Sequence, residues 1–264
     1  MKISIINFLQ KKLKTVLIST ISFWVVLISW MILADNFNPL ILPNPAQVID
    51  ALITLFENGE LQHHFFISIR RTLIGYGSAV IFGIILALML AKSWILRKIL
   101  RPLITVIQST PPIIWLVLAV IWFGISDDLT PIFLIFIVSL PIIFINIYEG
   151  IKSIDKELIE MAYVFNSSRK KILKEIYLPS LMPYLLSALS IAFAFAWKST
   201  VFAEYLGSSS GIGYALSMAN SNLETAELFA WGIILVLFML IVEYLILAPL
   251  QSKVMRWKGN GKST

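Results

Sequence analysis

Few residues of this chain have the type and spacing that catalysis needs. Cysteine is absent, which excludes disulfides, thiolate catalysis and cysteine-based metal sites. The two histidines, His63 and His64, are adjacent and so do not form the i, i+4 pair that one helix face offers to a metal. No GxxxxGK[ST] motif occurs, so the chain lacks the loop that cradles ATP phosphates in many ATPases. We therefore expect neither a metal site nor ATP hydrolysis by this chain.

The composition indicates a membrane protein. Hydrophobic residues make up 58% and charged residues 14% of the 264 positions, and the mean hydropathy is +0.86. Soluble domains carry about a quarter charged residues. A bilayer core about 30 Å thick needs about 20 apolar residues in a helix. Six such intervals predict six transmembrane helices: 15–34, 72–91, 102–126, 129–148, 178–197 continuing to 203, and 228–242 continuing to 250.

Four residues within these intervals could line a polar route through the membrane. Pro111 and Pro112 remove two backbone donors in the middle of the third interval, which suits either a packed kink or a water-lined cavity. Lys198 is a costly cation unless it snorkels, pairs or faces water, so an interfacial anchor and a pathway residue are both open. Glu204 lies too far around the helix to pair with Lys198, and its alternative role is hydrogen bonding within the bundle.

Basic residues predict the topology. All but three of the 21 Lys and Arg residues, namely Arg70, Arg71 and Lys198, lie in alternate segments between the predicted spans. Cytoplasmic loops carry this positive excess, so both termini are expected in the cytoplasm. The net charge of +6 is therefore a topology signal and does not call for a nucleic-acid partner.

The long polar interval 149–179 is patterned as a helical hairpin on the cytoplasmic side. Asp155 is suited to cap a first helix, Asn166 to adopt the left-handed turn that ends it, and Ser168 to cap a second helix towards Tyr177. One apolar stripe follows i, i+3, i+4, i+7 spacing: Leu158, Met161, Ala162 and Phe165. Such a hairpin suits insertion into a groove of a soluble partner, whereas an interfacial helix on lipid headgroups is the alternative.

The hairpin resembles the EAA loop in the membrane subunits of binding-protein-dependent ABC importers. The matching residues are Glu160, Met161, Ala162, Asn166, Ile176, Leu178 and Pro179. Met161 replaces the middle Ala of the family pattern and Asn166 replaces its Gly; both keep the apolar stripe and the left-handed turn. In that family the loop docks into the ATPase. The resemblance therefore implies an ATPase-coupling role for Leu158, Glu160, Met161, Ala162, Phe165, Asn166, Leu178 and Pro179.

Further segments resemble the nitrate, sulfonate and taurine branch of these permeases. They are LPNPAQVIDAL from Leu42, SIRRTLIGYGSAV from Ser68, QSTPPIIWLVLAVIWFGIS from Gln108 and FAEYLGSSSGIGYAL from Phe202. The resemblance covers roughly residues 40 to 258. It implies an all-α, six-helix type I ABC importer permease fold with a cytoplasmic coupling-helix hairpin. No linker, low-complexity tract or fixed-period repeat interrupts the sequence, so we expect a single domain over 1–264.

The same resemblance implies the partners and the location. The chain is expected to work as a homodimer with two ATPase subunits and an extracytoplasmic solute-binding protein, in a bacterial or archaeal plasma (inner) membrane. ATP and magnesium would bind the ATPase, and no cofactor would bind this chain. The implied solute is a small anion such as nitrate, a sulfonate or taurine. The alternatives are a thiamine-precursor pyrimidine or another small organic solute, and a stand-alone secondary transporter that would work without an ATPase.

Overall fold

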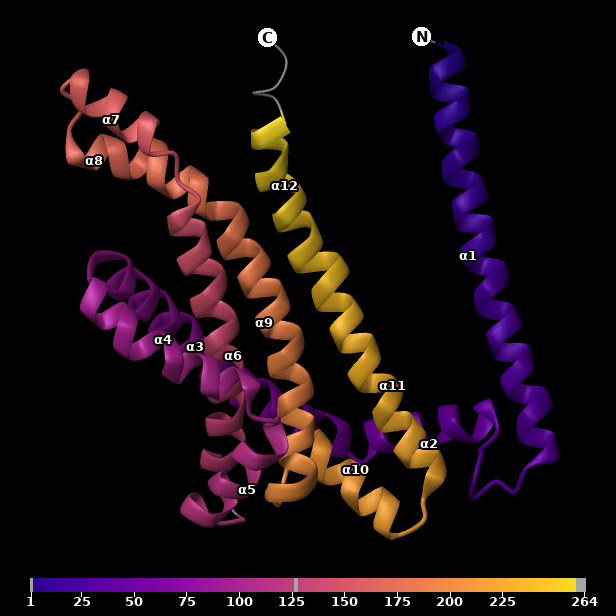
Figure 1. Ribbon diagram of the computed structural model, residues 1–264. Helices are drawn as coiled ribbons and strands as arrows, with labels where there is room; N and C mark the ends of the chain where they lie inside the picture. Colours follow the sequence, from indigo (N-terminus) through magenta and orange to yellow (C-terminus); the bar gives the residue numbers. More distant parts are fainter. Residues whose placement is uncertain (1, 126–127, 260–264) are drawn as a thin grey trace. The chain divides into compact units, whose positions relative to one another are not determined.

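The computed structural model describes residues 2–125 and 128–259, and all regular structure in this part of the chain is helical (Figure 1). This confirms the all-α prediction. The helices are α1 (Lys2–Asn36), α2 (Pro45–Glu57), α3 (Glu60–Lys92), α4 (Trp94–Ser109), α5 (Pro112–Phe123), α6 (Leu129–Lys152), α7 (Lys156–Val164), α8 (Arg169–Ile172), the π-helix η1 (Leu173–Tyr177), α9 (Leu178–Gly207), α10 (Ile212–Ser221), α11 (Thr225–Ile241), the π-helix η2 (Val242–Leu247) and α12 (Ala248–Gly259).

Each predicted span falls on helical structure. Four continuous helical stretches of the described chain are long and apolar enough to cross a membrane: Glu60–Lys92, Leu129–Lys152, Arg169–Gly207 and Thr225–Val254. The third predicted span, 102–126, falls on α4 and α5, which form a pair bent by 97°, and its last residue lies outside the described residues. The first span, 15–34, lies in α1, whose described apolar part is Thr20–Asn36.

The chain divides into two compact units. One combines Met1–Glu60 with Met218–Ile233, and the other combines Leu61–Ser217 with Ile234–Thr264. Helices α10 and α11 each continue from one unit into the other. The organisation as a single domain over 1–264 stays a prediction.

In the first unit, the irregular segment after α1 contains Pro43, and α2 begins at Pro45. Asn44 and Gln47 form a capping box, and Pro45 occupies the first turn, where its missing N–H costs nothing. The segment before α2 is held by the indole of Trp30, which donates to the carbonyl of Pro43 at 3.0 Å. The hydroxyl of Thr225 likewise donates to the carbonyl of Leu40 at 2.8 Å. This unit therefore ties α1, the loop after it and the start of α11 together.

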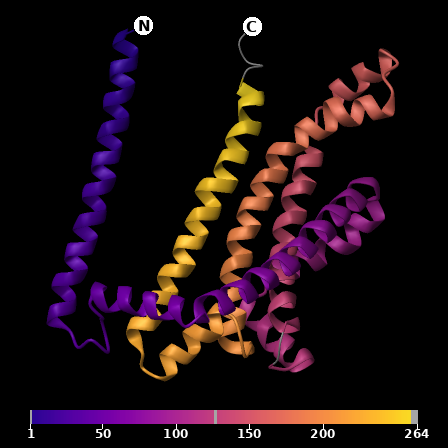
Figure 2. The same ribbon diagram turned by 180° about the vertical axis from the view of Figure 1, so that it is seen from behind.

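The second unit is built around α6, which packs along α9 and against α3. Figure 2 shows α3 crossing in front of α6 and α9. Glycine allows the close approach of α3 to α6, because a Cβ on Gly75 would lie 2.8 Å from the Ile132 carbonyl and one on Gly83 would lie 2.8 Å from the Ile143 side chain. The core cluster has α6 at its centre, with Leu140, Ile143, Phe144 and Ile147 all buried.

The break between α4 and α5 lies at the predicted Pro111-Pro112 pair. Thr110 is extended, with φ −77° and ψ 125°, because the ring of a following proline disfavours helical geometry in the residue before it. Pro112 then starts α5 at a position that needs no backbone donor. The two prolines therefore end one helix and begin another, and the third span is bent.

Candidate functional site

The hairpin between α6 and α9 is fixed by local hydrogen bonds. The carboxylate of Asp155 caps α7 by accepting from the N–H of Glu157 at 2.9 Å. Ser168 caps α8 by accepting from the N–H of Lys171 at 3.4 Å. Between the two helices Asn166 has a φ of 51°, which confirms the predicted left-handed turn.

The end of α7 has the hydrogen bonds of a Schellman motif. The N–H of Asn166 donates to the Tyr163 carbonyl at 2.9 Å, and the N–H of Ser167 donates to the Ala162 carbonyl at 3.0 Å. These bonds satisfy carbonyls that a helix end otherwise leaves to water. The turn is therefore held within the chain itself.

The apolar side of α7 is exposed. This helix buries none of its residues against the described part of the chain. The side chains of Leu158, Met161 and Phe165, from the predicted stripe, are 44%, 52% and 75% exposed. Two further apolar or aromatic side chains of α7 that were not predicted are also exposed, Val164 at 80% and Tyr163 at 58%. Several exposed apolar side chains on one short capped helix are typical of an interaction surface.

The other predicted coupling residues take different positions. Glu160 is exposed on α7, whereas Ala162 is half-buried. Leu178, exposed, and Pro179, half-buried, lie at the start of α9, where the chain leaves the hairpin. At the base of the hairpin, a Cβ on Gly150 would lie 2.8 Å from the ring of Tyr184, so α6 and α9 touch there.

A cavity of about 450 Å³ lies beside the break between α4 and α5. Both prolines are exposed, and Pro112 lines the cavity whereas Pro111 does not. Most of the wall is apolar, and three neutral polar side chains contribute to it: Gln108, Thr110 and Asn146. One amide hydrogen of Asn146 is used by the Ile142 carbonyl at 2.8 Å. The cavity wall carries no formal charge, but it can offer hydrogen bonds to a small solute.

Lys198 lies elsewhere. Its exposed side chain lines a separate apolar cavity of about 340 Å³ with Trp197 on α9 and Leu235 on α11. This cavity shares no lining residue with the one beside Pro112. The four predicted pathway residues are therefore not brought together, and the choice between anchor and pathway roles for Lys198 stays open.

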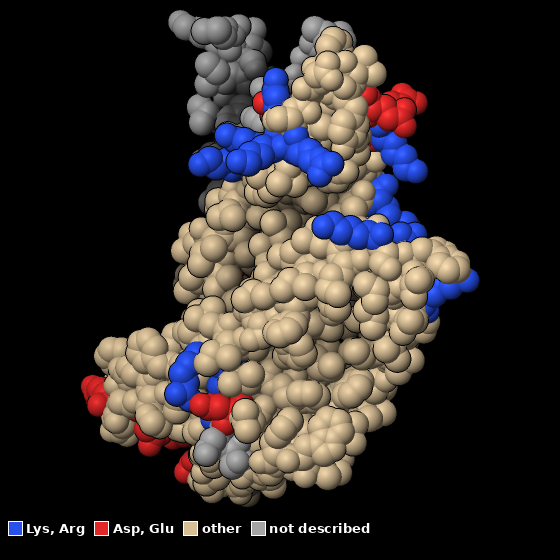
Figure 3. Space-filling model, turned by 90° about the vertical axis from the view of Figure 1, so that its left-hand side faces the viewer, with Lys and Arg blue, Asp and Glu red and all other residues tan. Residues whose placement is uncertain are grey.

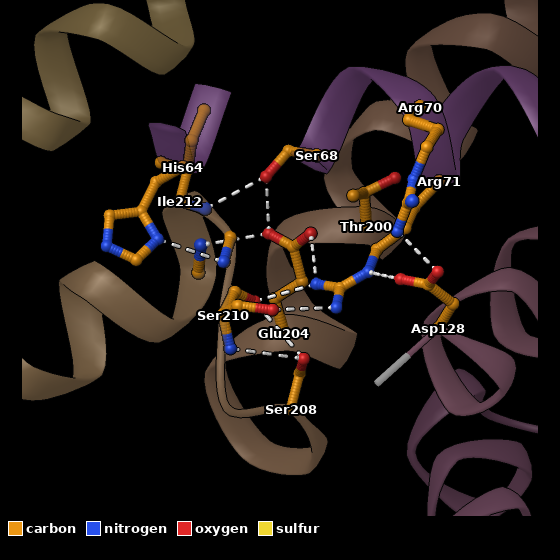
Figure 4. A network of polar contacts seen from close by, with 12 residues as sticks. His64, Ser68, Arg70, Arg71, Asp128, Thr200, Glu204, Ser208, Ser210 and Ile212 are labelled. Carbon is orange, nitrogen blue, oxygen red and sulfur yellow. Dashed lines mark hydrogen bonds and ion pairs between the residues drawn. The ribbon is translucent and has the colours of Figure 1, made fainter. Parts of the chain in front are cut away.

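Glu204 is fully buried, with an exposure of 0%, and pairs with Arg71, which is 1% exposed (Figure 4). The guanidinium of Arg71 on α3 donates to the Glu204 carboxylate at 3.0 Å. It also donates to the backbone carbonyl and the hydroxyl of Ser210, at 2.7 and 2.9 Å. A buried charge needs such a paired and hydrogen-bonded partner. In this structure Glu204 joins α9 to α3, which is the bundle hydrogen-bonding role weighed above.

The same carboxylate holds the turn into α10. The second oxygen of Glu204 accepts from the hydroxyl of Ser68 at 2.7 Å and from the N–H of Gly213 at 3.1 Å. Ser68 in turn accepts from the N–H of Ile212 at 2.9 Å. A Cβ on Gly211 or on Gly213 would overlap Glu204 or its neighbouring backbone. The glycines of the loop are therefore required by close packing on this carboxylate.

Asp128, just before α6, completes the network from its exposed side. It accepts from Arg71 at 2.8 Å and pairs with Arg70. Partial burial raises the pKa of Asp128, but hydrogen bonds and charge attraction from Arg71 and Arg70 outweigh it and lower the pKa below its ordinary value. Asp128 is therefore ionised at neutral pH.

Sequence reasoning missed Arg71 as the partner of Glu204. It treated Arg71 as a basic residue next to a span, but α3 begins at Glu60, so Arg71 lies within a continuous helix. The available signal was an arginine and a glutamate within or beside apolar runs, since such charges nearly always pair with each other.

Comparison with solved structures places the fold. The chain matches an inward-facing structure of the MetNI methionine ABC transporter with a TM-score of 0.61, at 15% identity, over 74% of this chain and 94% of that one. It matches an amino acid ABC transporter crystallised with histidines with a TM-score of 0.56, at 17% identity, over 80% and 94%. These likenesses support the predicted type I importer permease fold.

Comparison of sequences identifies the family. The taurine transport system permease protein TauC of Escherichia coli is 31% identical over 84% of this chain and 82% of its own length. A putative aliphatic sulfonates transport permease protein, SsuC of Bacillus subtilis, is 27% identical over 83% and 79%. The model of the binding-protein-dependent transport system inner membrane component family matches residues 79–255. The chain belongs to this family, and is thus a multi-pass plasma-membrane permease subunit of an ATP-driven importer whose ATP is hydrolysed by a separate chain.

Proposed function

We propose that this permease forms the translocation pathway for a small anion of the sulfonate or taurine kind and is driven through its α7–α8 hairpin. The observation that carries the coupling role is the exposed apolar surface of α7, presented by a turn that the chain fixes by itself. The names of the relatives TauC and SsuC support the solute class. Nitrate belongs to the same class of small anions.

Each hairpin would dock into one ATPase subunit, so two ATPases would serve a homodimer of permeases. The stripe of Leu158, Met161 and Phe165, with Val164 beside it, would fill an apolar groove on the ATPase. Glu160 would lie at the rim of that contact, and Leu178 and Pro179 would pass motion from the hairpin into α9. ATP and magnesium would stay on the ATPase.

The cavity beside the α4–α5 break is our candidate for the pathway. Gln108, Thr110 and Asn146 can donate or accept hydrogen bonds, and non-helical backbone at membrane depth is tolerated where it lines such a cavity. Neutral donors hold an anion more weakly than a cation would, which suits a solute that must leave again. A second copy of the chain would close the open side of this cavity, and an extracytoplasmic binding protein would deliver the solute.

The orientation follows from the basic residues. They lie in the N-terminal part of α1, at the end of α3 and in α4, in and beside the hairpin, and after η2. We therefore place both termini and the hairpin in the cytoplasm. Cysteine labelling in sealed cells should modify a cysteine at Asn58 from outside and one at Asn166 only after the membrane is made permeable. Outside labelling at Asn166 would contradict this topology.

The coupling role is tested by charging the hairpin. Met161→Glu would carry an unpaired carboxylate into the ATPase groove, at a cost on the order of several kcal/mol. Met161→Leu, which keeps an apolar side chain of similar size, is the matched control. We expect the Glu variant to insert in the membrane but to lose copurification with the ATPase and solute uptake, and the Leu variant to keep both. Normal uptake by Met161→Glu would refute the docking surface.

The solute is tested with proteoliposomes that hold permease, ATPase and binding protein. We expect ATP-dependent uptake of radiolabelled taurine, with competition by alkanesulfonates. Competition by a thiamine-precursor pyrimidine but not by sulfonates would favour the alternative solute class. Uptake that needs no ATPase would favour a stand-alone secondary transporter.

A further inference from the structure

A second cavity, of about 570 Å³, lies where η1 leads into α9 and where α12 passes beside it. Its wall is mainly apolar and includes Leu178, Met182 and Val254. Two lysines also line it, Lys174 from η1 and Lys253 from α12. A cavity with apolar walls and paired cations suits an amphiphilic anion better than either a neutral lipid or a small soluble ion.

The backbone around this cavity departs from regular α-helix. In η1 the N–H of Leu178 donates to the carbonyl of Leu173, five residues back. Pro179 and Pro183, both in the wall, carry no N–H, so the Pro179 carbonyl cannot receive the usual helical bond from position 183.

Within residues 2–125 and 128–259, neither lysine is engaged in a salt bridge. The salt bridges found in the described part of the chain involve Arg70, Arg71 and Lys152, and none includes Lys174 or Lys253. Figure 3 shows Lys and Arg side chains gathered in the upper part of the view, around the base of the α7–α8 hairpin. The segment from α8 to η1 contributes four basic residues and one acidic residue: Arg169, Lys170, Lys171, Lys174 and Glu175. The local potential therefore favours an anion.

The cleft between α9 and α12 is held in place beside the cavity. The side-chain amide of Gln251 donates to the hydroxyl of Ser190 on α9 at 2.6 Å. Gln251 is two residues before Lys253 on the same helix, so this bond holds α12 against α9 near the cavity. The cavity is thus a feature of packed helices in the second unit.

We propose that this cavity binds an acidic phospholipid, with its phosphate between Lys174 and Lys253 and its acyl chains along the apolar wall of α9 and α12. The assignment to the cytoplasmic leaflet rests on the orientation proposed above; the site itself does not. Anionic headgroups are concentrated in that leaflet, and basic pockets between membrane helices recognise them. A zwitterionic choline lipid lacks the net negative charge that two lysines would select.

Native mass spectrometry of the purified full-length chain in detergent tests this site, with phosphatidylglycerol and phosphatidylcholine as probes. The double variant Lys174→Gln/Lys253→Gln should weaken phosphatidylglycerol binding about 30-fold, as expected for the loss of two lysines near a lipid phosphate. The matched control is Lys170→Gln/Lys171→Gln, which removes the same charge from the neighbouring helix and should weaken binding much less, because neither lysine lines the cavity. Phosphatidylcholine should bind weakly to all three proteins.

Two further measurements keep the lipid assignment falsifiable. Ser180→Phe fills the cavity without changing the charge, and it should also abolish phosphatidylglycerol binding while the protein stays monodisperse. Inorganic phosphate at millimolar concentration should not displace the lipid, because it cannot use the apolar wall. Equal losses in the two lysine double variants, equal binding of the two lipids, or displacement by phosphate would each overturn the proposal. Lipid binding is measured without ATPase or solute, so a failure of uptake would leave this result standing.

Discussion

Breaking the pair formed by Arg71 and Glu204 from one side should be among the most destabilising single substitutions in the second unit. Arg71→Met would remove the charge and four of the bonds described above, and would leave the Glu204 carboxylate at 0% exposure without a cation. Breaking a buried pair from one side costs about 3–5 kcal/mol. Replacing both partners with apolar residues of similar volume is often close to neutral. We therefore expect Arg71→Met to be severe and Arg71→Met/Glu204→Leu to recover much of the loss.

The ion pairs of Asp128 should contribute much less to stability, because they are partly exposed to solvent. Its carboxylate is 32% exposed, and one of its two partners, Arg70, is 57% exposed, so solvent screens much of the interaction. Exposed pairs contribute about 0–1 kcal/mol. Asp128→Asn also leaves Arg71 paired with Glu204. The loss of stability on this substitution should be several times smaller than that of Arg71→Met.

The assay is thermal unfolding of the purified chain in one detergent, followed by the loss of monodisperse protein, for the parent, the three variants above and Glu204→Leu. A cost of about 3–5 kcal/mol corresponds to a lowering of the unfolding temperature on the order of 10 °C. The two single variants and the double variant form a mutant cycle that gives the coupling energy. The reasoning is refuted if Arg71→Met unfolds within about 2 °C of the parent, or if the double variant is less stable than both single variants.

Three further outcomes follow from positions already described. Gly213→Ala should destabilise by about 1–3 kcal/mol in the same assay, because a Cβ would overlap the Val201 carbonyl, whereas Gly77→Ala, in open space on α3, should be neutral or slightly stabilising. Asn166→Gly should keep ATPase-coupled uptake, whereas Asn166→Val, a β-branched residue at a φ of 51°, should lower it; equal uptake by both would argue against the turn. Because the folded-state pKa of Asp128 is lowered, its contribution to stability should be complete above about pH 5 and lost as the pH falls below about 4. The stability gap between the parent and Asp128→Asn should close over that range, and a gap that widens on acidification would contradict the sign.

Local signals predicted the hairpin closely because each of them acts within a few residues. The caps at Asp155 and Ser168 and the turn at Asn166 lie where the sequence placed them. The apolar helix intervals were also visible, since a membrane span needs a long uncharged run. The prolines at 111 and 112 predicted a break in the third span, but a proline pair does not determine the angle of a break, so the 97° bend was not predicted.

Long-range pairing was the part that the sequence could not supply. Arg71 and Glu204 are 133 residues apart, and nothing local marks them as partners. The Ser68 hydroxyl that bridges Glu204 and the turn before α10 has no sequence signature either. Val164, which is 80% exposed, was missed because it does not follow the i, i+3, i+4, i+7 spacing that defined the stripe.

The contact between Gly150 on α6 and Tyr184 on α9 determines how a displacement of the hairpin would reach these two helices. At that point α6 and α9 are as close as a missing Cβ allows, so the two helices form one stiff base for the hairpin. A push on the tip of α7 would then act as a torque on both helices about this contact, and neither helix would slide past the other. Adding a methyl group with Gly150→Ala would push α6 and α9 apart at this point, without altering the exposed side chains of α7 that we propose to dock on the ATPase.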